Sequence, residues 1–139
     1  MSSDREPQLI NVNESDKAIY DRLTEKGGPL EDFDNKYVFL LAMALGYANN
    51  IKTELTKKTW LFRTSYLDEN EKAMIKAVAI AEEGSLAALL DKEKIYSLAE
   101  QYAAGGIRLL GSIAFEKLGK DLYKKLLSEL QAYRDISAR

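Results

Sequence analysis

The segment 37–48 constrains the fold of this chain more than any other feature, because nearly every one of its residues is apolar. Some of these apolar residues recur at helical spacing and form one stripe. Further apolar residues, such as Val38 and Met43, extend the apolar surface around the rest of the helix. A helix that is apolar on all sides is typically the buried centre of a bundle. The sequence therefore predicts an all-α fold around a central helix that begins at Asp32 or Asp34 and ends with this segment.

Four further stretches show helical periodicity. The Gly-Gly-Pro run at 27–29 ends the first of them, and Asp68 followed by Glu71 opens the third predicted helix with the pattern of a capping box. The glycine pair at 105–106 interrupts the fourth, either as a kink in one long helix or as a close helix crossing. The predicted helices span about 13–26, 32–48, 68–84, 91–114 and 120–136, with a single helical turn at 85–90.

Two segments lack this periodicity. Residues 1–12 are predicted to be a loose or partly docked N-terminal segment that precedes a single helical domain at 13–139. Residues 49–67 are rich in Thr and Lys and hold an apolar group at 60–62, so we expect a long ordered loop between the second and third helices, with room in it for a short helical or extended piece. Because no stretch of useful length alternates like a strand, the predicted fold is all-α: a compact bundle of about five helices with that long loop.

The chain contains no cysteine and no histidine. Without cysteine it has no disulfide, no thiolate nucleophile and no sulfur ligand for zinc or iron. Without histidine it lacks the commonest general base and the commonest transition-metal ligand. Any chemistry would have to rest on carboxylates, Lys, Arg, Tyr, Ser or Thr. Because none of these forms a recognised catalytic motif, we expect a non-enzymatic protein without a cofactor.

Charge and hydropathy restrict the location and the partners. The formal net charge of −2 argues against a domain built wholly around polyanion binding. The polar start at 1–6 lacks the cationic and apolar regions of a secretory signal. The longest apolar run, 37–45, is less than half as long as a bilayer span requires. We therefore expect a cytoplasmic protein with no membrane association.

Two pairs of carboxylates have the spacing of metal ligands on a helix face. The pairs are Glu31 with Asp34, and Asp68 with Glu71. Two such pairs facing each other could hold hydrated magnesium, as in all-helical nucleotide pyrophosphohydrolases, so a magnesium-dependent phosphohydrolase is the alternative function. Both pairs lie at helix starts, however, where acidic residues are expected for capping and for the helix dipole. We therefore expect a capping role and no bound metal.

A basic and aromatic cluster lies in the segment 49–67. Its members are Lys52, Lys57, Lys58, Trp60 and Arg63, and Glu54 is the only acidic residue among them. Lysines around an aromatic ring are typical of a loop that approaches a phosphate backbone or the acidic face of a partner. The alternative is that the tryptophan fills the core while the lysines keep the loop in water. These residues are the candidate contacts with a partner, either a protein or DNA in a weak contact.

The middle of the chain resembles a family of small proteins associated with prokaryotic DNA-phosphorothioation systems. The resemblance covers about 20–115 and rests on the run YVFLLAMALGY at 37–47, the helix end IAEEG at 80–84 and the run LAEQYAAGGIRLL at 98–110. Members share an ALGY-like helix end, a polar loop and a YANGG-like kink, which departs from the family pattern here at Ala104. The resemblance implies an accessory, binding role in a modification or restriction complex that defends DNA, with protein partners and no catalytic residues to carry over.

The last predicted helix, 120–136, carries an apolar line at three-four spacing. Its members are Tyr123, Leu126, Leu130 and Tyr133. The line spans about two heptads, which is too short to hold a coiled coil by itself. We expect it to pack mainly on its own bundle, and a homodimer is the alternative.

Overall fold

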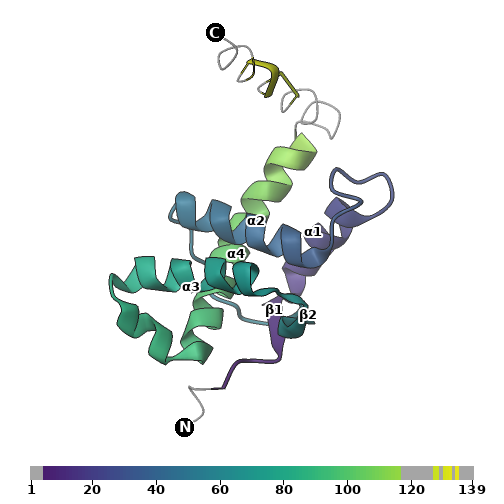
Figure 1. Ribbon diagram of the computed structural model, residues 1–139. Helices are drawn as coiled ribbons and strands as arrows, with labels where there is room; N and C mark the ends of the chain where they lie inside the picture. The colour runs from purple at the N-terminus through teal and green to yellow at the C-terminus, as the bar shows by residue number, and fades with distance from the viewer. Residues whose placement is uncertain (1–4, 117–126, 129, 133, 135–139) are drawn as a thin grey trace.

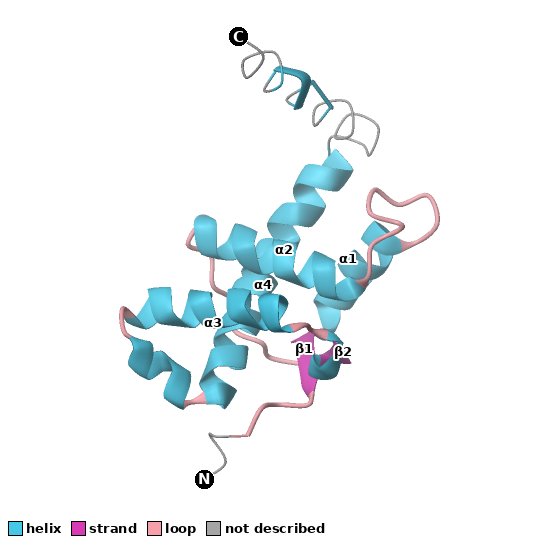
Figure 2. Ribbon diagram, in the orientation of Figure 1, coloured by secondary structure: helices cyan, strands magenta, loops and turns pink. Residues whose placement is uncertain are grey.

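The computed structural model describes residues 5–116, 127–128, 130–132 and 134 (Figure 1). In chain order they form β1 (Leu9–Asn13), α1 (Glu14–Thr24), α2 (Asn35–Ala48), β2 (Lys58–Arg63), the 3-10 turn η1 (Thr64–Tyr66), α3 (Glu69–Glu83), the 3-10 turn η2 (Leu86–Leu90) and α4 (Lys92–Glu116). Helices dominate, so the all-α prediction is roughly right, but a two-stranded sheet is also present (Figure 2). No helix in the described ranges has the length and apolar character needed to cross a membrane. The helix predicted at 120–136, with its homodimer seam, lies mostly outside these ranges.

α2 lies at the centre of the helical part, and α4 crosses it (Figure 1). The side chains of Val38, Phe39 and Met43 are at most 1% exposed, which confirms the predicted buried helix. Leu41 and Tyr47, by contrast, are 43% and 40% exposed. α2 is therefore buried at the centre of the fold, while one of its faces meets solvent.

The crossing of α2 and α4 is a direct approach of two backbones. A Cβ atom added at Gly106 would lie 1.7 Å from the carbonyl oxygen of Ala42, and one added at Gly46 would lie 2.0 Å from that of Tyr102. At Gly105 the added atom would lie 2.2 Å from a carbonyl oxygen of the loop that follows α2. No real side chain accepts such distances, so only glycine fits. α4 runs as one helix through the glycine pair, and of the two predicted explanations the close crossing is confirmed.

The helix boundaries follow the capping signals. Asp68 accepts a hydrogen bond from the backbone nitrogen of Glu71 at 2.8 Å, and the Glu71 carboxylate accepts one from the backbone of Asp68 at 2.8 Å, which completes the capping box. Gly84 ends α3 in the left-handed conformation, with a φ of 72°. Asp91 accepts a hydrogen bond from the backbone nitrogen of Lys94 at 3.1 Å as α4 begins. The predicted third and fourth helices, and the turn between them, are confirmed.

The sheet involves the two segments without helical periodicity. β1 begins at Leu9, so the last part of the segment predicted to be loose or partly docked is a paired strand. β2 and η1 occupy 58–66, so the segment 49–67 contains both an extended and a short helical piece, and its loop is confined mainly to the first part. The two strands pair antiparallel although both α1 and α2 lie between them in the chain.

A bulge explains why β2 was not recognised as a strand. Ile10 pairs with Phe62 and Asn11 with Trp60, so Leu61 is an extra residue on β2. A bulge interrupts the alternation of inward and outward side chains. Here it leaves both Leu61 and Phe62 buried, while Trp60 is exposed. β2 therefore shows an apolar group in the sequence and no strand-like alternation.

Candidate functional site

A cavity of about 470 Å³ lies between the start of α2 and the end of β2. We call it the aromatic groove. Its floor is apolar, because Leu61 and Phe62 are 6% and 4% exposed. Its rim is aromatic, because the side chains of Trp60 and Tyr66 are 53% and 61% exposed. The lining residues are Asp34, Asn35, Lys36, Trp60, Leu61, Phe62 and Tyr66.

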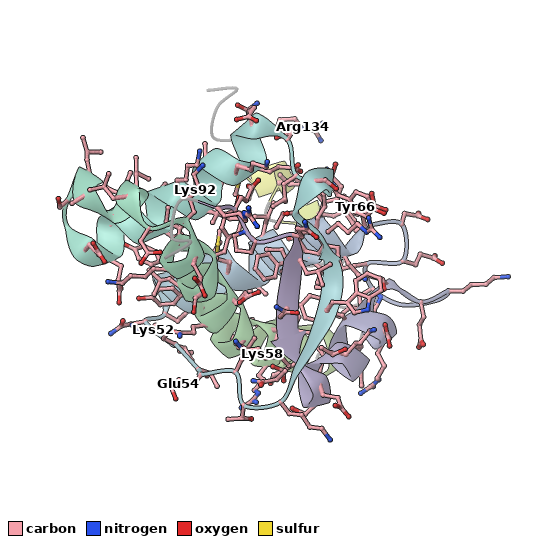
Figure 3. All side chains as sticks on the ribbon, turned by 90° about the horizontal axis from the view of Figure 1, so that it is seen from below. Lys52, Glu54, Lys58, Tyr66, Lys92 and Arg134 are labelled. Carbon is pink, nitrogen blue, oxygen red and sulfur yellow. The ribbon has the colours of Figure 1, made fainter. Side chains whose placement is uncertain are left out.

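Packing fixes both sides of the groove. The ring of Phe62 meets that of Phe39 on α2 edge to face, with 5.6 Å between the centroids. η1 turns the chain after β2, and the Thr64 hydroxyl anchors that turn by donating to the carbonyl oxygen of Pro7 at 2.7 Å. Tyr66 ends this turn and lies at the opposite end of β2 from Lys58 (Figure 3). The backbone that carries the rim residues is therefore held in place by contacts with α2 and with the segment before β1.

Lys36 ties the start of α2 to the start of α3. Its Nζ donates to the Glu71 carboxylate at 2.9 Å and to the carbonyl oxygen of Tyr66 at 2.9 Å. The hydrogen bond to Glu71 raises the pKa of Lys36, although desolvation opposes that shift. The positive charge at the groove is therefore engaged within the protein.

Asp34 is the other charged residue of the groove. It is the N-cap residue of α2, yet its side chain makes no capping hydrogen bond. Within the described ranges it also joins no ion pair. Among the charged residues that line the groove, Asp34 is thus the one whose exposed carboxylate has no ion pair in the described ranges.

The predicted basic cluster is dispersed, with two of its lysines in ion pairs. Lys52 pairs with Glu82 at the end of α3, at 2.7 Å, and Lys57 pairs with Glu14 at the start of α1, at 3.6 Å. Figure 3 shows Lys52 and Lys58 at separate points of the chain that enters β2. The remaining members also differ in setting: Trp60 lines the aromatic groove, and Arg63 ends β2. The alternative that Trp60 fills the core was wrong, since half of its side chain is exposed.

The four candidate metal ligands are used in the helix starts or remain apart. Glu31 accepts a hydrogen bond from the backbone nitrogen of Gly27 at 3.1 Å, and Asp68 and Glu71 form the capping box. Asp34 borders the aromatic groove. In the part of the chain that the structure describes, no group of three carboxylates could hold a metal ion. The structure therefore does not bring these four residues together as a magnesium site.

Sequence reasoning missed Glu100, which lies on α4 beside the sheet. Its side chain is 8% exposed, and its Oε2 accepts a hydrogen bond from the backbone nitrogen of Asn11 at 2.6 Å. Desolvation raises its pKa to about 7, against the lowering effects of Asn11 and Lys58. Glu100, Lys58 and Ser97 also line two small polar cavities, of about 220 and 160 Å³. The available signal was a glutamate between the apolar positions of a helix.

A second polar group is buried between α1 and α4. Asp16 is 2% exposed, and its Oδ1 accepts a hydrogen bond from Nε of Arg108 at 3.2 Å. Its Oδ2 and the hydroxyl of Tyr20 have no hydrogen-bond partner among the described residues. Desolvation, together with the charge of Asp16, raises the pKa of Tyr20.

Comparison with models of known protein families gives no match, and comparisons with curated proteins and with solved structures give none either. The aromatic groove therefore has to be interpreted from its own geometry. It combines exposed aromatic rings, an apolar floor and one open carboxylate on a backbone that is held in place. A groove with these features is suited to binding the side chains of another molecule.

Proposed function

We propose that this chain is a non-enzymatic interaction module that holds a protein partner in the aromatic groove. The observation that carries the proposal is the exposure of Trp60 and Tyr66, at 53% and 61%, beside a buried apolar floor. Large aromatic side chains are enriched at protein interfaces, because each buries a large area with few rotatable bonds. The exposure of two such side chains on one rim is explained if a partner protein covers them.

The rigidity of the groove supports the same proposal. The Lys36–Glu71 ion pair and the Phe39–Phe62 ring contact join α2 to α3 and to β2 across the groove. A surface that is already ordered before binding loses little conformational entropy when the partner arrives.

The partner that we propose is a protein component of a DNA-phosphorothioation-linked modification or restriction complex. The support is the resemblance of residues 20–115 to small proteins of such systems. The residues that line the groove, from Asp34 to Tyr66, all fall within that part of the chain. The chain would then act as an accessory of the complex and carry out no chemistry of its own.

A site-specific cross-linker tests this function. A photoreactive amino acid at position 66 replaces an exposed ring of the groove, and one at position 90 replaces Leu90, which is 74% exposed and does not line it. In the native host, we expect position 66 to cross-link to a component of the DNA-modification complex and position 90 to give no such product. Equal cross-linking from both positions, or none from position 66, would contradict the proposed interaction function. A groove partner with no link to DNA modification would contradict only the accessory role.

A further inference from the structure

The charges around the aromatic groove are unequal. Lys36 is already paired with Glu71, whereas Asp34 has no ion pair among the described residues. Glu31 and Asp32 are exposed in the segment that leads to Asp34, which places three carboxylates within four residues. An occupant that meets Asp34 is therefore favoured when it carries a positive charge.

The rim already shows an affinity for cations. The ammonium group of Lys17 on α1 lies 5.7 Å from the centroid of the Trp60 ring. This distance is within the range at which the negative face of an aromatic ring attracts a cation, and tryptophan is the most effective ring for this contact. More than half of the Trp60 side chain remains exposed in spite of this lysine. The exposed part of the indole is thus open to a cation from outside, for which Lys17 is a competitor.

An arginine side chain satisfies both features. Its guanidinium is planar, so it stacks on aromatic rings, and its fork of donors matches the two oxygens of a carboxylate. Lysine offers only a compact charge, and a purely apolar side chain would leave Asp34 desolvated without a partner. Trp60 and Asp34 line the same cavity, so one long side chain can reach both.

We propose that the occupant of the aromatic groove is a basic segment of the partner protein, whose arginine stacks on Trp60 and pairs with Asp34. This inference rests on the proposed interaction function and adds the chemistry of the partner to it. Lys17 competes with the incoming arginine for the indole. The binding of the segment weakens as salt is added, because the pair with Asp34 lies near the surface.

The chain offers a direct readout, because Trp60 is its single tryptophan. The probe is a short peptide of glycine, serine and arginine, titrated into the full-length protein while tryptophan fluorescence is followed. The matched control peptide has citrulline in place of arginine, which keeps the shape and removes the charge. We expect the arginine peptide to bind about tenfold more tightly than the citrulline peptide.

Three variants locate the contact. Asp34→Asn should weaken the arginine peptide about fivefold, which corresponds to the loss of one partly exposed charge pair. Asp32→Asn removes a neighbouring carboxylate that does not line the groove and should change binding by less than about twofold. Lys17→Gln should strengthen binding, because a competing cation is lost. Far-ultraviolet circular dichroism checks that each variant is folded; asparagine is itself a good N-cap residue, so Asp34→Asn keeps α2.

Several outcomes would overturn the inference. They are equal binding of the arginine and citrulline peptides, a preference for an acidic peptide or for single-stranded DNA, weaker binding by Lys17→Gln, and the absence of any fluorescence change at millimolar arginine peptide. If cross-linking from position 66 persists under any of these outcomes, the groove still holds a partner and only its basic character is wrong. If that cross-link is also absent, the proposed function fails as well.

Discussion

The α2–α4 crossing and the β1–β2 sheet are held in place by different kinds of contact. At the crossing, backbone meets backbone, and the carbonyl oxygen of Ala42 occupies the space that a side chain at Gly106 would need. At the sheet, polar groups far apart in the sequence are joined, as Glu100 on α4 accepts from the backbone of Asn11 on β1. The crossing has no room for one more atom, whereas the sheet is bordered by three cavities among the described residues.

The crossing therefore acts as a scaffold, and the sheet carries the surface that is available for binding. Close helix packing leaves one permitted arrangement, so it fixes where α2 begins relative to the rest of the fold. The sheet places exposed side chains such as Trp60 next to that fixed helix. Binding groups are commonly carried on variable segments that a rigid scaffold positions.

The largest effect is expected at the crossing. Gly106→Ala would place a Cβ atom 1.7 Å from a backbone oxygen, which cannot move aside as a flexible side chain can. The helices must separate, and we expect a loss of about 4 kcal/mol or more in the free energy of unfolding, a large fraction of the roughly 5–15 kcal/mol that is typical of a folded domain. Urea unfolding followed by circular dichroism measures this loss.

Gly111→Ala is the matched control on the same helix. Its added Cβ atom would lie 3.0 Å from the Cγ2 methyl group of Ile19, which belongs to a side chain and not to the backbone, and alanine favours a helix over glycine by about 1 kcal/mol. We therefore expect a change in stability of less than about 1 kcal/mol. Equal effects of the two substitutions would remove the argument for a close backbone crossing.

The next effect concerns pH and belongs to the sheet. The pKa of Glu100 is raised in the folded protein to about 7, from an ordinary value of 4.5, because the carboxylate is desolvated. The folded state therefore holds this proton more tightly than the unfolded chain, so the associated stability is fully present below about pH 4.5 and is lost as the pH rises through 7. The chain has no histidine, so no imidazole titrates in this window. We expect a loss of about 3 kcal/mol between these limits.

Glu100→Gln shows whether that loss comes from this residue. The amide keeps an acceptor for the backbone nitrogen of Asn11 and has no proton to release. We expect the stability of the variant to be nearly constant between pH 5 and 8. A variant with the same slope as the unaltered protein would show that another group is responsible.

A smaller effect is expected inside the helical part, where a buried polar group lacks a partner. The Tyr20 hydroxyl is buried without a hydrogen bond among the described residues, whereas buried Asn13 near the sheet uses its side-chain amide in two. Tyr20→Phe removes the unsatisfied hydroxyl and keeps the ring, so it should raise the free energy of unfolding by about 1 kcal/mol. Asn13→Ala should lower it by at least as much. Thermal unfolding of both variants shows whether the two buried polar groups differ in sign.

The same contrast decides how much could be predicted from the sequence. Helix boundaries depend on nearest residues, so Asp68, Glu71 and Gly84 revealed α3 directly. The glycine pair at 105–106 restricted the fourth helix to a kink or a close crossing. Only the position of α2 decides between them, because the contacted oxygen belongs to Ala42.

The sheet and the groove depend on pairing between distant segments. The bulge at Leu61 removed the alternation by which β2 could have been recognised. Trp60 was singled out as a partner contact and Asp34 as an alternative metal ligand, and the structure places both in one cavity with Tyr66, which was not named. Their meeting requires β1 to pair with β2 and Lys36 to reach Glu71, and neither contact leaves a local signal.

The most direct test of the account is Trp60→Ala, which separates binding from stability. Because its side chain is 53% exposed, we expect the free energy of unfolding to change by less than about 1 kcal/mol, whereas Phe62→Ala, at 4% exposed, should cost about 3 kcal/mol. Circular dichroism gives the stabilities, and partner cross-linking from position 66 gives the binding. The account predicts that Trp60→Ala abolishes the cross-link in a protein of unchanged stability. A Trp60→Ala protein that is destabilised like Phe62→Ala, or that still cross-links fully, would contradict it.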